Sequence, residues 1–161
     1  MTSYSITVYT DGGSRNTGNI KGGHVLPTDK AAWAYLILYE NKKKTGSKGV
    51  FGATNNQMEL SAVLEALRKL YHMKLNQENI LLISDSKYVL DSINKGWLYN
   101  WAKNNWINSS KQEVKNRNLW EAIYKALPYF PKITFAWTKG HANSEGNNYV
   151  DKLLNQTMDK M

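Results

Sequence analysis

Residues 80–86 read ILLISDS. Four successive apolar residues in so short a segment are typical of a β-strand that is buried on both faces, as the strands of a parallel sheet are. Asp85 and Ser86 follow directly, and either side chain could cap a helix that the sequence predicts through about Ile93. This junction of strand and helix predicts an α/β fold, with a carboxylate where a buried strand ends.

Upstream of this strand, the hydrophobic pattern predicts three further strands and one long helix. In the first strand apolar residues alternate with hydroxyl-bearing residues, and Asp11-Gly12-Gly13 has the composition of a turn that ends it. Short links suggest that the three strands form an antiparallel meander. The predicted ranges are strands at 5–10, 32–40 and 45–53, a loop at 14–30, a turn at 41–44 and an amphipathic helix from 56 to about 74.

Downstream of Ile93, an insert rich in Trp, Lys and Asn has no clean period, and it is followed by a helix, an alternating strand and a final helix. The chain has no internal repeat or low-complexity linker, so we expect one domain over residues 1–161. We predict a five-stranded mixed sheet, three antiparallel strands and then two parallel ones, flanked by helices. The ranges are an insert at 95–117, a helix at 118–127, a strand at 132–137 and a helix at 144–160.

The composition narrows the classes of partner. The 161 residues include 21 Lys and Arg against 13 Asp and Glu, a net charge of +8 that favours polyanions, although a basic protein can also lack such a partner. Cysteine is absent, which excludes disulfides and thiolate metal sites. The sequence begins without the pattern of a signal peptide and contains no apolar run of the ~20 residues that a membrane span needs, so a cytoplasmic location is expected.

Four acids could form a metal site. Each has a purely structural explanation: Asp11 in a turn, Glu59 in a capping box with Asn56 as N-cap, Asp85 as a helix cap. A solvated helical acid would explain Asp151, although apolar neighbours fit that explanation poorly. Strand ends and neighbouring helices could instead bring the four together, where they would repel one another unless hard cations such as Mg²⁺ or Mn²⁺ were bound.

Four strings resemble the signatures of type 1 ribonuclease H and occur in that family's order. The resemblance runs from about residue 4 to residue 159, and we expect no hybrid-binding domain before it. The strings are YTDGGS (9–14), TNNQMEL (54–60), SDSKYV (84–89) and KGHANSEGNNYVDKL (139–153). The resemblance implies hydrolysis of the RNA strand of an RNA/DNA hybrid by a monomeric enzyme, giving 5′-phosphate and 3′-hydroxyl ends.

The resemblance also assigns roles to residues. It implies that two Mg²⁺ ions, for which Mn²⁺ would substitute, are held by Asp11, Glu59, Asp85 and Asp151, and that His141 supports proton transfer or product release. Asn55 and Asn56 would contact 2′-hydroxyl groups, with capping as a competing role for Asn56. Thr54 would contact a DNA phosphate, and Ser86 would add a hydroxyl beside the metal site.

The insert resembles the basic handle with which some of these enzymes grip the DNA strand. It holds five basic residues and one acid, interleaved with aromatic residues. Trp97 and Lys103 are the predicted DNA contacts, whereas one or two of the other Trp residues could simply be core. Two departures from the family pattern are the long loop at 14–30 and Asn148, which stands where an acid is frequent.

Two rival functions share this fold. One is a non-catalytic module that binds hybrids, and the other is a DNA-cutting integrase or resolvase relative. The complete set of acids argues against the first, because a binder gains nothing from negative charge facing phosphates. The TNNQME string and the handle favour hybrid recognition over the second.

Overall fold

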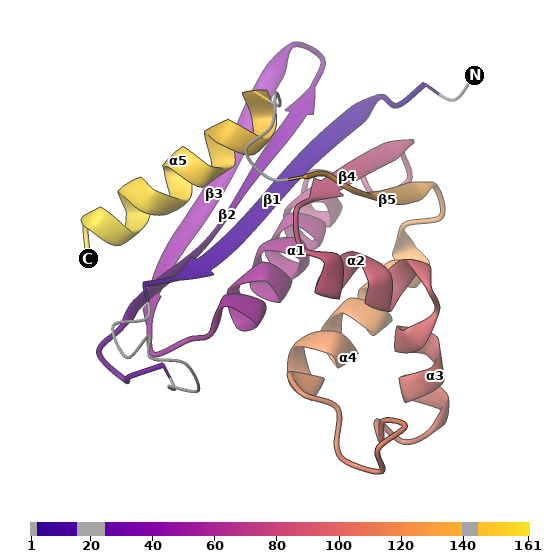
Figure 1. Cartoon of the computed structure of the whole chain (residues 1–161). Helices are drawn as coiled ribbons and strands as arrows, with labels where there is room; N and C mark the ends of the chain where they lie inside the picture. Colours follow the sequence, from indigo (N-terminus) through magenta and orange to yellow (C-terminus); the bar gives the residue numbers. More distant parts are fainter. Residues whose placement is uncertain (1–2, 16–24, 140–144) are drawn as a thin grey trace.

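The computed structural model describes residues 3–15, 25–139 and 145–161, and its five strands form one mixed sheet in the order β3-β2-β1-β4-β5 (Figure 1). β1 to β3 pair antiparallel, and β4 pairs parallel with both β1 and β5. The predicted sheet is therefore confirmed. The strands are β1 (Ile6–Ser14), β2 (Lys30–Tyr39), β3 (Lys42–Phe51), β4 (Ile80–Ser84) and β5 (Ile133–Trp137); the helices are α1 (Asn55–His72), α2 (Lys87–Asn94), α3 (Trp97–Lys103), α4 (Arg117–Ala126), the 3₁₀ helix η1 (Leu127–Tyr129) and α5 (Glu145–Asp159).

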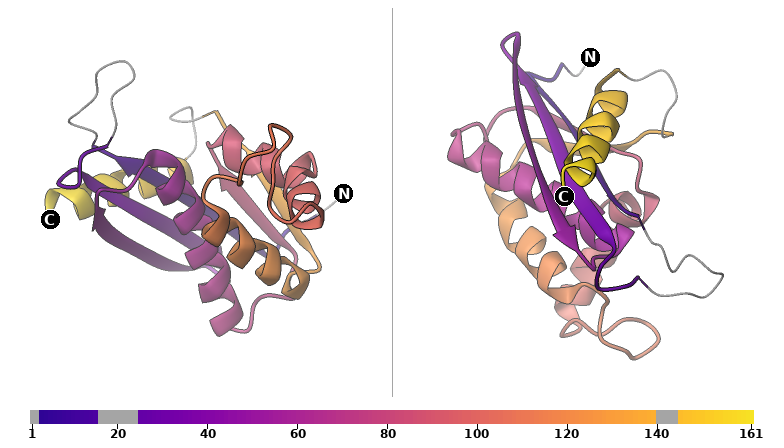
Figure 2. Two further views of the ribbon diagram at one scale, coloured as in Figure 1. Left: turned by 90° about the horizontal axis from the view of Figure 1, so that it is seen from below. Right: turned by 90° about the vertical axis from the view of Figure 1, so that its left-hand side faces the viewer.

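Helices cover both faces of the sheet. In Figures 1 and 2, α5 lies on one face, whereas α1 lies on the other with α4 packed beside it. Alternate residues of β2 explain this arrangement, since successive side chains of a strand point to opposite faces. Tyr35 and Ile37 join the main core with α1, while Ala32 and Ala34 form a second cluster with the α5 residue Leu154. The small alanines leave room for α5 close to the sheet.

Two predicted strand boundaries were wrong. β1 does not end at Asp11: it continues through both glycines to Ser14, because Gly12 and Gly13 pair with β2. The turn between β2 and β3 is shorter than predicted, since Glu40 and Asn41 adopt φ angles of 47° and 60°. Such a pair of left-handed residues makes a tight hairpin turn, so the lysines at 42–44 belong to β3.

The predicted cap of α1 was also wrong. Thr54 rather than Asn56 is the N-cap: its hydroxyl accepts a hydrogen bond from Gln57 N (3.1 Å), and Gln57 Oε1 accepts one from Thr54 N (2.7 Å). The capping box thus lies two residues earlier than predicted and leaves Glu59 out. At α2, the Ser86 hydroxyl accepts a hydrogen bond from Val89 N (3.3 Å), which settles that cap in favour of Ser86.

The insert contains a helix that the sequence pattern did not predict, α3. Trp101 of α3 packs edge-on against the fully buried Trp120 with ring centroids 5.7 Å apart. Trp106, which follows α3 in the insert, packs against Tyr124 with centroids 5.9 Å apart. These two Trp residues therefore support the core, as one alternative held. No helix in the described part of the chain is long and apolar enough to cross a membrane.

Candidate active site

Three of the four predicted acids meet at the middle of the sheet. Asp11 on β1, Glu59 on α1 and Asp85 after β4 each offer a carboxylate oxygen, and these atoms lie within 4.8 Å of one another. The sheet register brings the two aspartates together, because Tyr9 pairs with Ile83 in parallel strands and each aspartate lies two residues farther along the chain. We refer to these three residues as the acidic triad. Their grouping agrees with the expectation that strand ends and a neighbouring helix bring the acids together.

Gly12 allows Glu59 to reach the strand. A Cβ atom on Gly12 would lie 2.2 Å from the backbone carbonyl carbon of Met58, so only glycine permits α1 to pass this close. The Gly12 N–H donates to Asp11 Oδ1 at 2.9 Å and also to a carboxylate oxygen of Glu59. This role of Gly12 was not predicted from the sequence, although a glycine inside a strand is itself a signal of close backbone approach.

Burial and mutual repulsion shift the ionisation of the triad. Asp11 and Glu59 are each only 8% exposed. Burial, followed by the charges of Asp85 and Asp151, raises the pKa of Asp11 to about 7. Burial and the Asp11 charge likewise raise the pKa of Glu59 well above its usual value. The ionised carboxylates are disfavoured here because they are buried close together, and a bound cation would stabilise them. Carboxylate oxygens are hard ligands, which suit a divalent cation such as Mg²⁺ or Mn²⁺.

The other predicted catalytic residues lie differently. Asp151, half-buried on α5, is not one of the three grouped carboxylates, but it is near enough for its charge to raise the Asp11 pKa. His141 lies outside the described residues. Trp137 was not predicted as a site residue, yet its indole Nε1 donates to the backbone carbonyl of Asp85 at 3.1 Å.

The predicted substrate contacts Asn55, Asn56, Thr54 and Ser86 flank the triad in sequence, at the starts of α1 and α2. Asn55 is held against β1, because Ser14 N donates to Asn55 Oδ1 at 2.7 Å, whereas Asn56 is exposed and takes no part in the cap. The cap roles of Thr54 and Ser86 use their hydroxyl oxygens as acceptors, so each hydroxyl can still donate to a phosphate or sugar.

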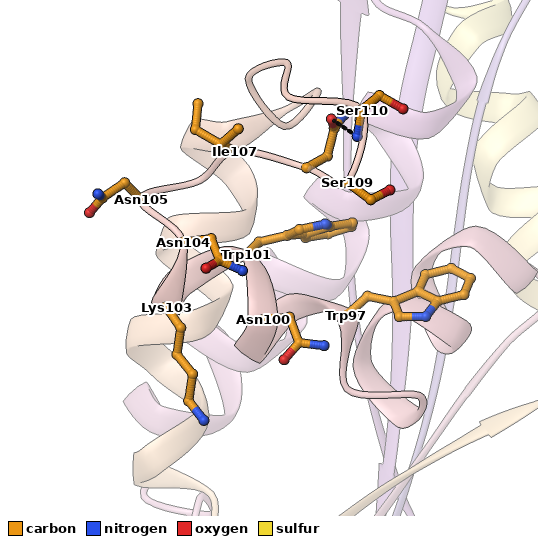
Figure 3. A pocket seen from close by; sticks show the side chains of 10 residues that line it. Trp97, Asn100, Trp101, Lys103, Asn104, Asn105, Ile107, Ser109 and Ser110 are labelled. Atoms are coloured by element: carbon orange, nitrogen blue, oxygen red, sulfur yellow. Dashed lines mark hydrogen bonds between the residues drawn. The ribbon is translucent and has the colours of Figure 1, made fainter.

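The two predicted DNA contacts lie on α3, beside a surface hollow of about 930 Å³ (Figure 3). Trp97 is 42% exposed and Lys103 is also exposed. They do not converge: Figure 3 shows them extending to different sides of the helix, as a separation of six residues on a helix dictates. The two side chains could therefore touch neighbouring parts of a duplex, but not one group together.

The raised pKa values predict how metal-free stability depends on pH. Asp11 has a pKa of about 7 in the folded state against its ordinary value of 3.8, so between these pH values the folded state binds more protons than the unfolded state. The free energy of unfolding without metal should therefore fall as the pH rises from 4 to 7, by an amount on the order of a few kcal/mol. Urea unfolding with a chelator at pH 5 and pH 8 measures this.

Mg²⁺ should reverse that loss, because a cation binds the ionised carboxylates of the folded state. Its stabilising effect should be larger at pH 8 than at pH 5. An equal effect of Mg²⁺ at both pH values, or a metal-free stability that falls between pH 4 and 7 by as much in Asp11→Asn as in the unmodified chain, would contradict the assignment.

Comparison with known proteins agrees with this geometry. The family described as RNase H matches residues 3–159. Ribonuclease H of Clostridium botulinum is 41% identical over 155 residues, 96% of each chain, and ribonuclease HI of Haemophilus influenzae is 40% identical over 92% of this chain and 86% of its own. The solution structure of the PFV RNase H domain has a TM-score of 0.75 and 26% identity, covering 99% of this chain and 98% of that one. The chain therefore belongs to the type 1 ribonuclease H family.

Proposed function

We propose that this chain hydrolyses the RNA strand of RNA/DNA hybrids with two divalent cations held by Asp11, Glu59, Asp85 and Asp151. Membership of the ribonuclease H family supports the reaction and the substrate. The observation that carries the metal assignment is the triad, whose carboxylate oxygens lie within 4.8 Å of one another in a largely buried site. Mg²⁺ is the proposed ion, with Mn²⁺ able to replace it.

When bound, the cations supply activation of water and stabilisation of the charge that builds on the phosphate oxygens. The chain itself does the positioning. Gly12 N–H orients carboxylate oxygens of both Asp11 and Glu59, and neighbouring parallel strands hold Asp11 and Asp85 side by side. Asp151 contributes from the opposite layer, on α5, and completes the set of four acids.

His141 has a supporting role in this proposal. An imidazole titrates near neutral pH, so it can accept or deliver a proton or assist departure of the product. The proposal assigns this role by the matching motif, since His141 lies outside the described residues.

Discrimination between RNA and DNA is assigned to the starts of α1 and α2. Ser14 N–H occupies Asn55 Oδ1, which leaves the amide N–H groups of Asn55 for a 2′-hydroxyl oxygen. Asn56 is exposed beside it and is free of the capping role that competed with substrate contact. Thr54 would donate to a DNA phosphate and Ser86 to a sugar or phosphate beside the metal ions.

A labelled RNA strand in a hybrid tests the reaction. With Mg²⁺, we expect fragments that carry 5′-phosphate and 3′-hydroxyl ends, because water and not a 2′-hydroxyl attacks phosphorus. Fragments ending in 2′,3′-cyclic phosphate would refute attack by water.

A monomeric state and a cytoplasmic location remain predictions from the sequence.

The handle, residues 95–117, is proposed to bind the DNA strand. Lys103→Ala should raise KM a few-fold and reduce the slope of log KM against log salt by about 0.7–0.9, the value for one lost phosphate contact. Trp97→Ala should raise KM with little change in that slope, because a ring packs on sugar and carries no charge. Lys48→Ala removes the same charge from the edge strand β3 as a control, and an equal effect there would count against the handle.

A further inference from the structure

Lys87 and Trp137 form an exposed pair next to the acidic triad. The indole of Trp137, at the end of the edge strand β5, donates from Nε1 to the backbone carbonyl of Asp85 at 3.1 Å. The ammonium of Lys87, the first residue of α2, lies 4.9 Å from the centroid of the same ring. One ring thus connects a cation to the backbone of a triad residue.

Packing does not account for this pair. Trp137 is 45% exposed, Lys87 is exposed, and neither belongs to a core cluster. Among the described residues, no carboxylate lies within ion-pair distance of the Lys87 ammonium, although Asp91 of the same helix pairs with Lys95. The charge is therefore held near an acidic site by an aromatic face and remains able to meet an anion.

We propose that Lys87 binds a phosphate of the cleaved strand next to the scissile phosphate, and that Trp137 positions the Lys87 side chain. This inference rests on the proposed function, in which Asp85 holds a cation at the scissile phosphate. Lys87 lies two residues beyond Asp85, so its side chain starts beside that position. A compact ammonium suits a single phosphate oxygen. The triad repels a polyanion, and a cation at its rim offsets that repulsion for the incoming strand.

Trp137 acts through Lys87 and Asp85 and is a positioning residue. Its ring restricts the flexible lysine stem by attracting the ammonium to its face, and its N–H fixes the carbonyl that follows β4. Parallel pairing keeps the two residues together, since Ser84 pairs with Trp137 and Thr138 N donates to Ser84 O at 2.9 Å. The pair is thus attached to the two hydrogen-bonded strands β4 and β5.

Steady-state cleavage of a labelled hybrid at several salt concentrations tests the proposal. Lys87→Ala should raise KM about fivefold, leave kcat within about twofold, and lower the salt slope by about 0.7–0.9. Lys87→Arg should keep the slope. Lys42→Ala is the matched control: Lys42 also lies over a ring, 5.9 Å from the Tyr39 centroid, but at the hairpin remote from the triad. Its removal should change neither KM nor the slope beyond twofold.

Two tryptophan variants separate positioning from folding. Trp137→Leu should lower the salt slope as Lys87→Ala does, and combining the two should lower it no further. Trp137→Phe keeps an aromatic ring and should keep the salt slope. The same variant loses the hydrogen bond from Nε1 to the Asp85 carbonyl, and this loss should lower kcat. If Trp137→Leu does not fold, Trp137→Phe together with Lys87→Ala still decides the matter.

A hybrid with one neutral methylphosphonate linkage beside the scissile phosphate locates the contact. At one such position the neutral linkage should raise the KM of the unmodified chain about fivefold. It should not raise the KM of Lys87→Ala above the value that this variant has with the unmodified hybrid. Lys87→Ala kinetics and salt slope equal to those of the unmodified chain, or additive effects at every linkage, would overturn the proposal while leaving the proposed function intact. Absence of cleavage by the unmodified chain would instead overturn the proposed function.

Discussion

Replacing Asp11 by Asn should reduce cleavage of the hybrid by at least about 10³-fold, because cation binding and charge stabilisation together contribute several kcal/mol to the barrier. Asp11 is one of the three grouped carboxylates, and Asp85, Glu59 and Asp151 all influence its pKa. Asn keeps the size of the side chain and its hydrogen bond from Gly12 N–H, but it cannot carry the negative charge that a divalent cation requires.

Binding of the hybrid should survive this substitution within a few-fold, since Asp11 repels phosphates when no cation is bound. Strand-labelled cleavage and a separate binding measurement therefore distinguish an enzyme from a module that only binds. Asp159→Asn is a matched control. Asp159 lies on α5 about 12 Å farther along the helix than Asp151, and it pairs with Arg15 at 2.7 Å. Equal loss of cleavage in both variants would contradict the role of Asp11, as would full activity of Asp11→Asn.

Gly12→Ala should destabilise the fold by about 3 kcal/mol, a large effect for one methyl group. The added Cβ would overlap the backbone of Met58 and Glu59, at 2.2–2.4 Å, so α1 as a whole must move away from β1. That movement would also withdraw Glu59 from the triad. Urea unfolding should report the loss of stability, and hybrid cleavage should fall together with it.

The neighbouring glycine provides the control. A Cβ on Gly13 would meet the Leu154 side chain at 3.4 Å and Asn55 Oδ1 at 3.9 Å, which are ordinary contacts with side-chain atoms. Gly13→Ala should therefore change the free energy of unfolding by less than about 1 kcal/mol. Similar destabilisation by both substitutions would show that strand glycines matter here for backbone flexibility and not for the approach of α1.

The sheet and the triad could be predicted because their signals are local. The buried run at 80–84, the alternation at 5–10 and the helical period after Asn56 each specify one element, and parallel strands must place Asp11 and Asp85 at one edge. The order of the elements then leaves few topologies. That prediction needed no knowledge of how any side chain packs.

Two kinds of failure occurred. The cap of α1 was misassigned although its signal is local, because Thr54 with Gln57 fits the capping-box pattern as well as Asn56 with Glu59 does. The others came where distant contacts decide. The two glycines after Asp11 have turn composition, but pairing with β2 keeps them in the strand. The insert lacked a clean period because its Trp residues serve two purposes, packing for Trp101 and exposure for Trp97, so α3 was not predicted.

We claim that the triad serves hydrolysis of RNA in a hybrid. The most direct test compares RNA/DNA, DNA/DNA and RNA/RNA duplexes of one sequence, each strand labelled in turn, with Mg²⁺ and then with Mn²⁺. We predict cleavage of the RNA strand of the hybrid alone, lost on chelation and in Asp11→Asn. Equal cleavage of DNA/DNA, or no cleavage of the hybrid with either ion, would contradict the claim.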